Sequence, residues 1–312
     1  MKKQITHKQH YVWRKYLETW GESKDNKVFV WWNYHNLVKQ TDLFDILREN
    51  DFYAFASLNK LELFVLKEMF AKTNNKTIKE ANLGVDSFVN LVQEISDVLV
   101  DTTEFDEYLI QAGETIQTKI ENSGYNHLEL LKNENLKQFN YEEDGKMIDF
   151  LIFLLFQFLR TKKNKDGAIG SVIQNDSKLK ELYKKEMNDQ NDYELDWEKV
   201  YNFGFIYLVQ KSAYYMTTHN AHIKLLKSKN ARFIVSDQPV YNIAEDKLND
   251  FDLFYPISPT QAVIVSTKYQ ENKIEEITDS EVLFYNHLTL KNAYKFVLGV
   301  SKEYVNFSWP EF

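Results

Sequence analysis

The sequence predicts an α+β fold, namely a predominantly helical single domain of residues 1–312 with a small, mainly antiparallel sheet. Apolar residues recur at helical spacing through most of residues 43–228. Segments rich in β-branched and aromatic residues occur instead at about 27–35 and 231–267. Because these strand-forming segments lie on both sides of the helical middle, we expect the N-terminal strand to join C-terminal strands in one sheet, against which the helices pack.

Most of the expected elements are helices. A first helix over residues 13–20 begins after His10 and ends at Gly21, and residues 27–34 are expected to form a strand buried on both faces. Further helices are expected over residues 43–55, 59–72, 86–100, 101–121, 126–137, 147–161, 176–187 and 196–227, with a polar break at 164–170. Towards the end of the chain we expect a strand at 261–267, a helix at 279–300 and a short strand at 304–307.

Composition and charge indicate a globular, cytoplasmic chain. Of the 312 residues, 44% are hydrophobic and 27% are charged, and the formal net charge is −8. This charge disfavours indiscriminate binding to nucleic acid, which requires a basic surface. The absence of cysteine excludes disulfides and thiol nucleophiles and fits a reducing compartment. Lys2 and Lys3 are not followed by the apolar segment of a signal peptide, and the apolar run 147–159 is too short to span a bilayer, so we expect no membrane association.

The stretch 231–259, ARFIVSDQPVYNIAEDKLNDFDLFYPISP, contains three of the four prolines of the chain. Its β-forming residues end at Ser236 and Asp237, just before Pro239, which favours an extended chain for the residue that precedes it. A carboxylate at such a corner between a strand and a turn is well placed for binding or catalysis. The alternative is that Asp237 hydrogen-bonds the backbone of its own turn.

Two segments resemble a known family. QHYVWRKYL, which contains His10, and FIVSDQPV, which contains Asp237, are similar to the HYVP and SDNP motifs of a bacterial and fungal family called domain of unknown function 4238. Trp13 stands where that family usually has proline, and Gln238 stands where it usually has asparagine. The longer side chain of Gln238 leaves the role of that position open.

Other segments follow the order of the same family. LFQFLRT, with Gln157 and Arg160, resembles its central Q-x-x-R-T helix, and RENDFYAF, with Glu49, resembles its E-N-x-F-Y segment. YPISP, with Ser258, and the helix that carries Asn286 match the positions of a proline-serine turn and a closing helix. The resemblance implies a single-chain soluble protein with relatives among phage-defence genes. It implies no particular reaction.

Three of these residues point to phosphate chemistry. His10 can give or take a proton near neutral pH, Arg160 can clamp a phosphate, and Asp237 can orient the histidine. Such a set can break a phosphodiester or an N-glycosidic bond, so we expect these three residues to be catalytic. Gln157 lies three residues before Arg160 and therefore on the same helix face. The residues expected to bind the substrate are Tyr11, Glu49, Gln157, Ser236, Ser258 and Asn286.

Each candidate also has a structural interpretation. His10 could be satisfied by the backbone at the entry to a helix. Arg160 could complement the C-terminal dipole of its helix or pair with an acid. Glu49 could be a second carboxylate of the site, but we favour a core-facing position as the ionic partner of Arg160.

Metal and partner sites are less clearly indicated. His219 and His222, with His7 or Asp237, could bind a metal, but their i, i+3 spacing without an acid between them differs from known zinc motifs, so no metal ligand is assigned and the cofactor is left open. Two basic runs could bind nucleic acid or a nucleotide, although such runs are more often solvated faces. They are Arg160, Lys162, Lys163 and Lys165, and Lys224, Lys227, Lys229 and Arg232.

The sequence therefore predicts a hydrolase that acts on a phosphate-bearing substrate, preferably a nuclease of RNA or DNA serving as a toxic effector in anti-phage defence. The alternative is a non-catalytic module that binds a nucleotide or a phage component and signals to a partner. The two hypotheses differ in whether variants of His10 and Asp237 lose cleavage while they keep their fold. Substrate, oligomeric state and activating trigger are not determined by the sequence.

Overall fold

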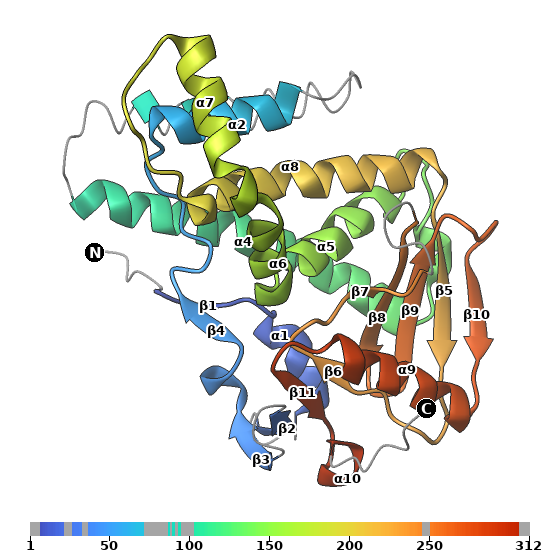
Figure 1. The fold of residues 1–312 in the computed structure, drawn as a ribbon. Coiled ribbons are helices and arrows are strands. Elements are labelled where there is room, and N and C mark those ends of the chain that lie inside the picture. The colour runs from blue at the N-terminus through green and yellow to red at the C-terminus, as the bar shows by residue number, and fades with distance from the viewer. Residues whose placement is uncertain are drawn as a thin grey trace. The chain divides into compact units, whose positions relative to one another are not determined.

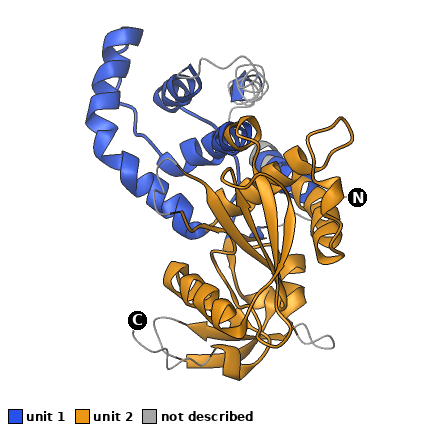
Figure 2. Cartoon of the chain, turned by 90° about the vertical axis from the view of Figure 1, so that its right-hand side faces the viewer, with its two compact units in different colours: residues 1–9, 50–119, 162–214 blue, residues 10–49, 120–161, 215–312 orange. Residues whose placement is uncertain are grey.

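The computed structural model describes residues 7–21, 27–32, 37–71, 87, 89–90, 93–94, 103–244 and 250–305. These residues form helices and small, mostly antiparallel sheets, which confirms the predicted α+β class (Figure 1). The chain divides into two compact units, each assembled from three separate segments (Figure 2). Unit 1 comprises residues 1–9, 50–119 and 162–214, and unit 2 comprises residues 10–49, 120–161 and 215–312.

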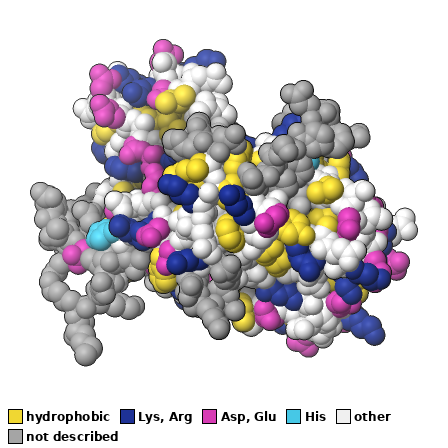
Figure 3. All heavy atoms as spheres, turned by 90° about the horizontal axis from the view of Figure 1, so that it is seen from below, with side chains coloured by type: hydrophobic (Ala, Val, Ile, Leu, Met, Phe, Trp, Pro, Cys, Tyr) yellow, Lys and Arg dark blue, Asp and Glu magenta, His cyan; other side chains and the backbone are white. Residues whose placement is uncertain are grey.

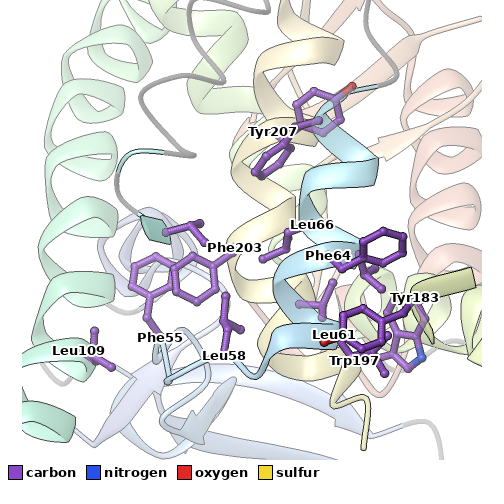
Figure 4. Packing of buried hydrophobic residues seen from close by; sticks show 14 residues of the cluster. Phe55, Leu58, Leu61, Phe64, Leu66, Leu109, Tyr183, Trp197, Phe203 and Tyr207 are labelled. Atoms are coloured by element: carbon purple, nitrogen blue, oxygen red, sulfur yellow. The ribbon is translucent and has the colours of Figure 1, made fainter. Parts of the chain in front are cut away.

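Unit 1 is built from helices around a hydrophobic core. Its described elements are α2 (Lys60–Ala71), the first part of α4 (Thr103–Lys132), α6 (Lys162–Val172), the 3-10 turn η4 (Ile173–Asn175), α7 (Asp176–Met187) and most of α8 (Trp197–Thr218). Leu61, Phe64 and Leu66 of α2 lie in the core shown in Figure 4. There Phe64 packs edge-on against Tyr183 of α7, with the ring centroids 5.6 Å apart. The helices predicted over residues 59–72 and 176–187 are thus confirmed.

Unit 2 contains two sheets. The strand order of the first is β10 (Lys273–Glu276), β5 (His222–Lys227), β9 (Gln261–Ser266), β8 (Asp252–Ser258) and β7 (Tyr241–Asn242). The order of the second is β3 (Leu37–Asp42), β2 (Lys27–Trp32), β11 (Phe296–Gly299) and β6 (Val235–Ser236). Pairing is antiparallel throughout these two sheets except between β10 and β5. The N-terminal strand β2 joins C-terminal residues as predicted, since it pairs with β11 and shares a sheet with β6. The expectation of one sheet is wrong, because β9, the strand expected over residues 261–267, belongs to the other sheet, and β11 lies within the helix expected over residues 279–300.

The remaining elements of the described chain are short strands, helices and turns. They are β1 (Lys8–His10), which pairs with β4 (Arg48–Asn50), α1 (Arg14–Leu17), η1 (Glu18–Trp20), η2 (Leu43–Asp45), η3 (Leu136–Gln138), α5 (Met147–Leu159), α9 (Asp279–Asn292) and α10 (Lys302–Val305). The boundary between the units falls within β1 and within β4. All nine residues that the sequence marked as site candidates lie in unit 2.

Strand β8 buries both of its faces. Successive residues of a strand point to opposite sides, so Phe254 and Tyr255 face different partners. The ring of Phe254 stacks on Tyr285 of α9, with centroids 4.8 Å apart and planes at 5°. The ring of Tyr255 packs against Tyr16 of α1 at 5.0 Å and Phe153 of α5 at 6.4 Å. The Tyr255 side of the sheet is therefore covered by α1 and α5.

Helices α4 and α5 approach each other closely at Gly124. A Cβ atom at this position would lie 2.1 Å from Cδ2 of Phe153, so only glycine fits without moving the helix. The two helices are antiparallel. Gly124 of α4 contacts Phe153 of α5, and Glu121, earlier in α4, pairs with Arg160, which is later in the sequence than Phe153. This packing brings Glu121 to the end of α5.

Several expected helices are wrong in extent because left-handed residues interrupt them. Leu47 and Asp51 have φ values of 58° and 51°, and residues 43–55 form η2 and β4 instead of a helix. Asn220 has a φ of 49° and ends the long helix expected over 196–227, so that β5 follows α8. The polarity of 222–227 also alternates, which is the pattern of a strand rather than a helix.

Other predictions are wrong for different reasons. The two helices expected over 101–121 and 126–137 are one helix, α4, because Phe153 fills the space that Gly124 leaves. The expected break at 164–170 is helix α6, in which two exposed glycines are tolerated. Residues 302–305 form α10, and the helix from 279 ends at 292 before β11. Strand β2 buries one face and leaves the other partly exposed. The helix expected at 86–100 lies mostly outside the described residues.

Besides α2 and α7, two more expected elements have nearly the predicted bounds. Helix α5 and strand β9 match the predictions for 147–161 and 261–267. No helix among the described residues is long and apolar enough to cross a membrane.

We predict that Asn286→Ala lowers the free energy of unfolding by about 2–4 kcal/mol, because it leaves two backbone groups without partners. The buried Asn286 amide accepts the N–H of Ile234 at 3.0 Å and donates to the carbonyl of Arg232 at 2.8 Å. Urea denaturation measures the change. Lys291→Ala, at an exposed position of the same helix, is the control and should change stability by less than about 0.5 kcal/mol. Equal stability of the two variants would contradict this role of Asn286.

Candidate functional site

The site begins with His10, which ends β1 and precedes α1, as the sequence predicted. Burial, and to a smaller extent the charges of Arg14, Arg48 and Arg160, lower the pKa of its imidazole from the usual 6.5 to about 4, while a hydrogen bond to the backbone of Ile46 opposes them. The imidazole is therefore neutral at pH 7. His10 lies in a positive field produced by guanidinium groups.

These three arginines, which we call the arginine cluster, come from separate parts of unit 2 and lie at different depths. Arg14 begins α1, Arg48 begins β4, and Arg160 follows the last residue of α5. The side chains of Arg14 and Arg48 are 39% and 27% exposed, whereas that of Arg160 is fully buried. A dissolved anion would therefore meet Arg14 and Arg48 first.

Each arginine of the cluster has a nearby carboxylate. Arg14 lies 3.5 Å from Glu18, and Arg48 lies 2.9 Å from Asp45. Pairs as exposed as these contribute little to stability and can rearrange when an anion binds. Arg14 and Arg48 can therefore exchange their carboxylate partners for a bound anion.

The third pair is buried and joins Arg160 to Glu121 of α4. A guanidinium nitrogen of Arg160 lies 2.5 Å from Oε1 of Glu121, whose side chain is 13% exposed. Glu121 is a site residue that sequence analysis missed. Its only signal is the packing of α4 against α5, which lies in the tertiary structure and not in any local pattern.

Two uncharged polar groups adjoin this pair. Burial raises the pKa of the Tyr255 hydroxyl. The charge of Arg160 lowers this pKa and the charge of Glu121 raises it, so both members of the ion pair act on the hydroxyl. The Gln157 side chain is buried. Gln157 lies about one helical turn after Phe153 and one turn before Arg160, so the three residues share one face of α5. Neither the Gln157 amide nor the Tyr255 hydroxyl has a hydrogen-bond partner among the described residues.

Asp237 has a structural role at the junction of β6 and β11. Its buried carboxylate accepts the backbone N–H groups of Tyr294, Lys295 and Phe296 at 2.8, 2.6 and 3.2 Å. Its own N–H donates to the carbonyl of Phe296. These contacts are long-range, unlike the bonds within one turn that the sequence offered as an alternative. The Asp237 carboxylate thus binds the start of β11. His10 and Arg160, by contrast, are close enough for the charge of Arg160 to lower the pKa of His10.

Ser236, Ser258 and Asn286 also have structural contacts. The hydroxyl of Ser236 donates to the carbonyl of Gln238 and accepts its N–H, which stabilises the turn after β6. The hydroxyl of Ser258 accepts the N–H of Thr260 in the turn between β8 and β9. Asn286, as described above, holds the segment that precedes β6.

Tyr11 and Glu49 occupy opposite environments. The Tyr11 side chain is buried, and its N–H donates to the carbonyl of Leu47. Glu49 is exposed on β4, so the expected core-facing position was wrong, and Arg160 forms a buried ion pair with Glu121. The reason is that β4 is a strand and not a helix, which changes the direction of the Glu49 side chain.

Among the described residues, no group of three or more His, Asp or Glu side chains is arranged to hold a metal ion. His219 stacks on the ring of Tyr215 at 4.1 Å, and its Nδ1 atom bonds the Tyr215 carbonyl. His222 lies on β5. The structure therefore assigns local contacts to His219 and a sheet position to His222.

The basic runs are interspersed with acids. Lys224, Lys227 and Lys229 lie 3.5, 2.5 and 2.8 Å from Glu275, Glu134 and Glu276. In unit 1, Lys162 and Lys165 lie 3.5 and 3.3 Å from Asp166 and Glu198. On the face in Figure 3, basic and acidic side chains are mixed. Such paired charges weaken any broad attraction to nucleic acid.

Residues 8–303 match the family described as protein of unknown function (DUF4238). The chain belongs to the DUF4238 family. The match covers His10, Glu121, Arg160 and Asp237 together, and it confirms the resemblance read from the HYVP-like and SDNP-like segments. No curated protein and no solved structure matched this DUF4238 chain.

The neutral His10 makes the stability of this DUF4238 protein dependent on pH. As the pH falls from 6.5 to 4, the imidazole takes up a proton in the unfolded chain before it does so in the folded one, so stability is lost across this window. We expect a loss of about 1–3 kcal/mol, which allows for partial solvation of the ring. His10→Asn should lack this component when urea denaturation at pH 7 is compared with pH 4.5. His219→Asn, at an exposed position, is the control, and identical slopes for His10→Asn and the native chain would contradict the prediction.

The structural role of Asp237 predicts that Asp237→Ala lowers the free energy of unfolding by roughly 3 kcal/mol or more, because three backbone N–H groups lose a charged acceptor. Asp237→Asn keeps one acceptor oxygen and should lose less. Thermal unfolding followed by circular dichroism measures both variants. Asp144→Ala removes an exposed acid of the same unit and should be close to neutral. If Asp237→Ala were as stable as Asp144→Ala, the carboxylate would be free for another role.

Proposed function

We propose that this protein is a phosphate-directed hydrolase whose substrate is a nucleotide or a nucleic-acid phosphodiester. The observation that supports the proposal is the position of His10 in the field of the arginine cluster. Three guanidinium groups from separate segments act on one imidazole. Guanidinium groups bind phosphate through paired hydrogen bonds, and a neutral imidazole beside them can accept a proton.

Each member of the cluster has a role in this proposal. Arg14 and Arg48, which reach solvent, would bind the non-bridging oxygens of the phosphate. Arg160 would hold charge at the buried end, with Glu121 keeping its guanidinium in position. The attacking water would form the new bond to phosphorus and lose its proton to His10, while the leaving oxygen departs and takes a proton from solvent.

Binding of the substrate would itself activate His10. A bound phosphate adds negative charge beside the imidazole and offsets the guanidinium field, which raises the pKa of His10 from about 4 towards neutrality. The imidazole thereby becomes a stronger base only when substrate is present. This coupling explains why a histidine of such low pKa can still serve in catalysis.

A second function is a non-catalytic module that binds a nucleotide and signals to a partner. The contacts of Asp237 favour this alternative, because the acid expected to orient His10 is occupied by backbone amides. Binding requires only the arginine cluster, whereas hydrolysis also requires a base. Action as a toxic effector in anti-phage defence belongs to the hydrolase proposal, whereas the module would leave the toxicity to its partner.

We predict that Arg48→Gln and Arg14→Gln each lower kcat/KM at least about tenfold, and that His10→Asn lowers kcat by about a hundredfold or more. Cleavage of labelled RNA and DNA oligonucleotides and release of nucleotides from them are the measurements, with and without EDTA to test for a metal. Lys229→Gln is the matched control, since its side chain is 76% exposed and pairs with Glu276 outside the cluster.

Binding of the same oligonucleotides separates the two functions. If the arginine variants weaken binding but the native protein cleaves no oligonucleotide, the protein is a binding module and the hydrolase proposal is wrong. If Arg14→Gln, Arg48→Gln and Lys229→Gln behave alike in both assays, neither function uses the arginine cluster.

A further inference from the structure

Gln157 and Tyr255 are buried polar side chains of unit 2 whose polar atoms have no hydrogen-bond partner among the described residues. The Gln157 side chain is 1% exposed and Tyr255 is fully buried, yet both ends of the amide and the phenolic hydroxyl lack partners. Neighbouring tyrosines show the usual arrangement. The hydroxyl of Tyr16 donates to the carbonyl of Pro256 at 2.7 Å, and that of Tyr241 donates to the carbonyl of Tyr285 at 3.2 Å. Buried polar groups are nearly always paired, so two unpaired ones in one place point to a ligand.

Both groups adjoin the inner end of the arginine cluster. Gln157 shares a helix face with Phe153 and Arg160, Phe153 contacts the ring of Tyr255, and the charge of Arg160 acts on the Tyr255 hydroxyl. The surrounding side chains are aromatic. Trp13 packs on Phe153 with ring centroids 6.2 Å apart, and Tyr16 packs on Tyr255. An amide, a hydroxyl and aromatic rings thus lie beside a buried guanidinium.

We propose that Gln157 and Tyr255 bind the base of a nucleotide whose phosphate is held by Arg14 and Arg48. The inference rests on the proposed function and names its substrate class. A primary amide offers one donor and one acceptor side by side, which matches the edge of a nucleobase, and aromatic side chains suit its flat faces. Inorganic phosphate and sugar phosphates lack such an edge.

The proposal also accounts for the energetic cost of the two unpaired groups. A buried polar group without a partner destabilises the protein, and an apolar side chain of similar size would not. Sites built to bind a substrate often keep such groups at the expense of stability. A base that pairs with them would remove the cost, so an analogue without the base should bind much more weakly.

The first test compares ligands by isothermal titration calorimetry with the full chain. The probes are AMP, GMP, CMP, UMP, the four nucleosides, ribose 5-phosphate and inorganic phosphate. We expect at least one nucleotide to bind about tenfold or more tightly than ribose 5-phosphate. Gln157→Leu and Tyr255→Phe should reduce that ratio towards one without weakening ribose 5-phosphate, whereas Arg48→Gln should weaken every phosphate-bearing probe.

The outcomes separate the base site from the phosphate site. If ribose 5-phosphate binds as tightly as all four nucleotides, the base site is overturned and the proposed function stands. If nucleosides bind as tightly as nucleotides and phosphate has no effect, the base site stands and the phosphate-directed function is overturned. If no probe binds, the base site is overturned, and the oligonucleotide assays alone decide the proposed function.

The second test measures the stability of the unliganded protein. Gln157→Leu and Tyr255→Phe should leave the melting temperature unchanged or raise it by roughly 1–3 °C, because each removes a buried group without a partner. Tyr16→Phe is the matched control for the tyrosine. Gln9→Leu is the control for the glutamine, since the buried Gln9 accepts the N–H of Tyr53 at 2.7 Å. Both controls should lower the melting temperature. If Gln157→Leu and Tyr255→Phe lower it equally, the two groups have structural partners and the inference is wrong.

Discussion

The buried guanidinium of Arg160 constrains much of unit 2, because a charge in the protein interior has to be paired. Its partner, Glu121, comes from a different helix, so the pair forms only if α4 and α5 pack antiparallel in one register. Gly124 permits that register by admitting the ring of Phe153. Phe153 in turn contacts Tyr255 of β8. One ion pair thus depends on the packing of two helices and on their contact with the sheet.

The same packing determines the electrostatics of the candidate site. Arg160 contributes to the field that keeps His10 neutral, and it acts on the hydroxyl of Tyr255. The chain as a whole is acidic, with a formal net charge of −8, and its basic runs are paired with acids. The positive charges that act on His10 are those of the arginine cluster. A focused field of this kind suits a small anionic ligand better than the broad backbone of a duplex.

Motif-like segments contain both structural and functional candidates. Asp237 and Asn286 belong to segments that resemble family motifs. Asp237 holds backbone groups at the start of β11, and Asn286 holds those that precede β6. Gln157 belongs to such a segment too, but its amide has no partner in the described chain. Both kinds of residue are buried and polar, so residue type alone does not distinguish them. What distinguishes them is the number of backbone groups with which each side chain forms hydrogen bonds.

The sequence by itself determined the fold class, helices α2, α5 and α7, strand β9, and the common helix face of Gln157 and Arg160. These features follow from side-chain periodicity and β propensity, which are properties of neighbouring residues. Tertiary structure alone decided that Glu121 pairs with Arg160, that Glu49 is exposed, and that Asp237 faces β11. It also decided where left-handed residues such as Asn220 end a helix. These outcomes depend on contacts between residues far apart in the chain, and no local pattern encodes the register in which two helices or two strands meet.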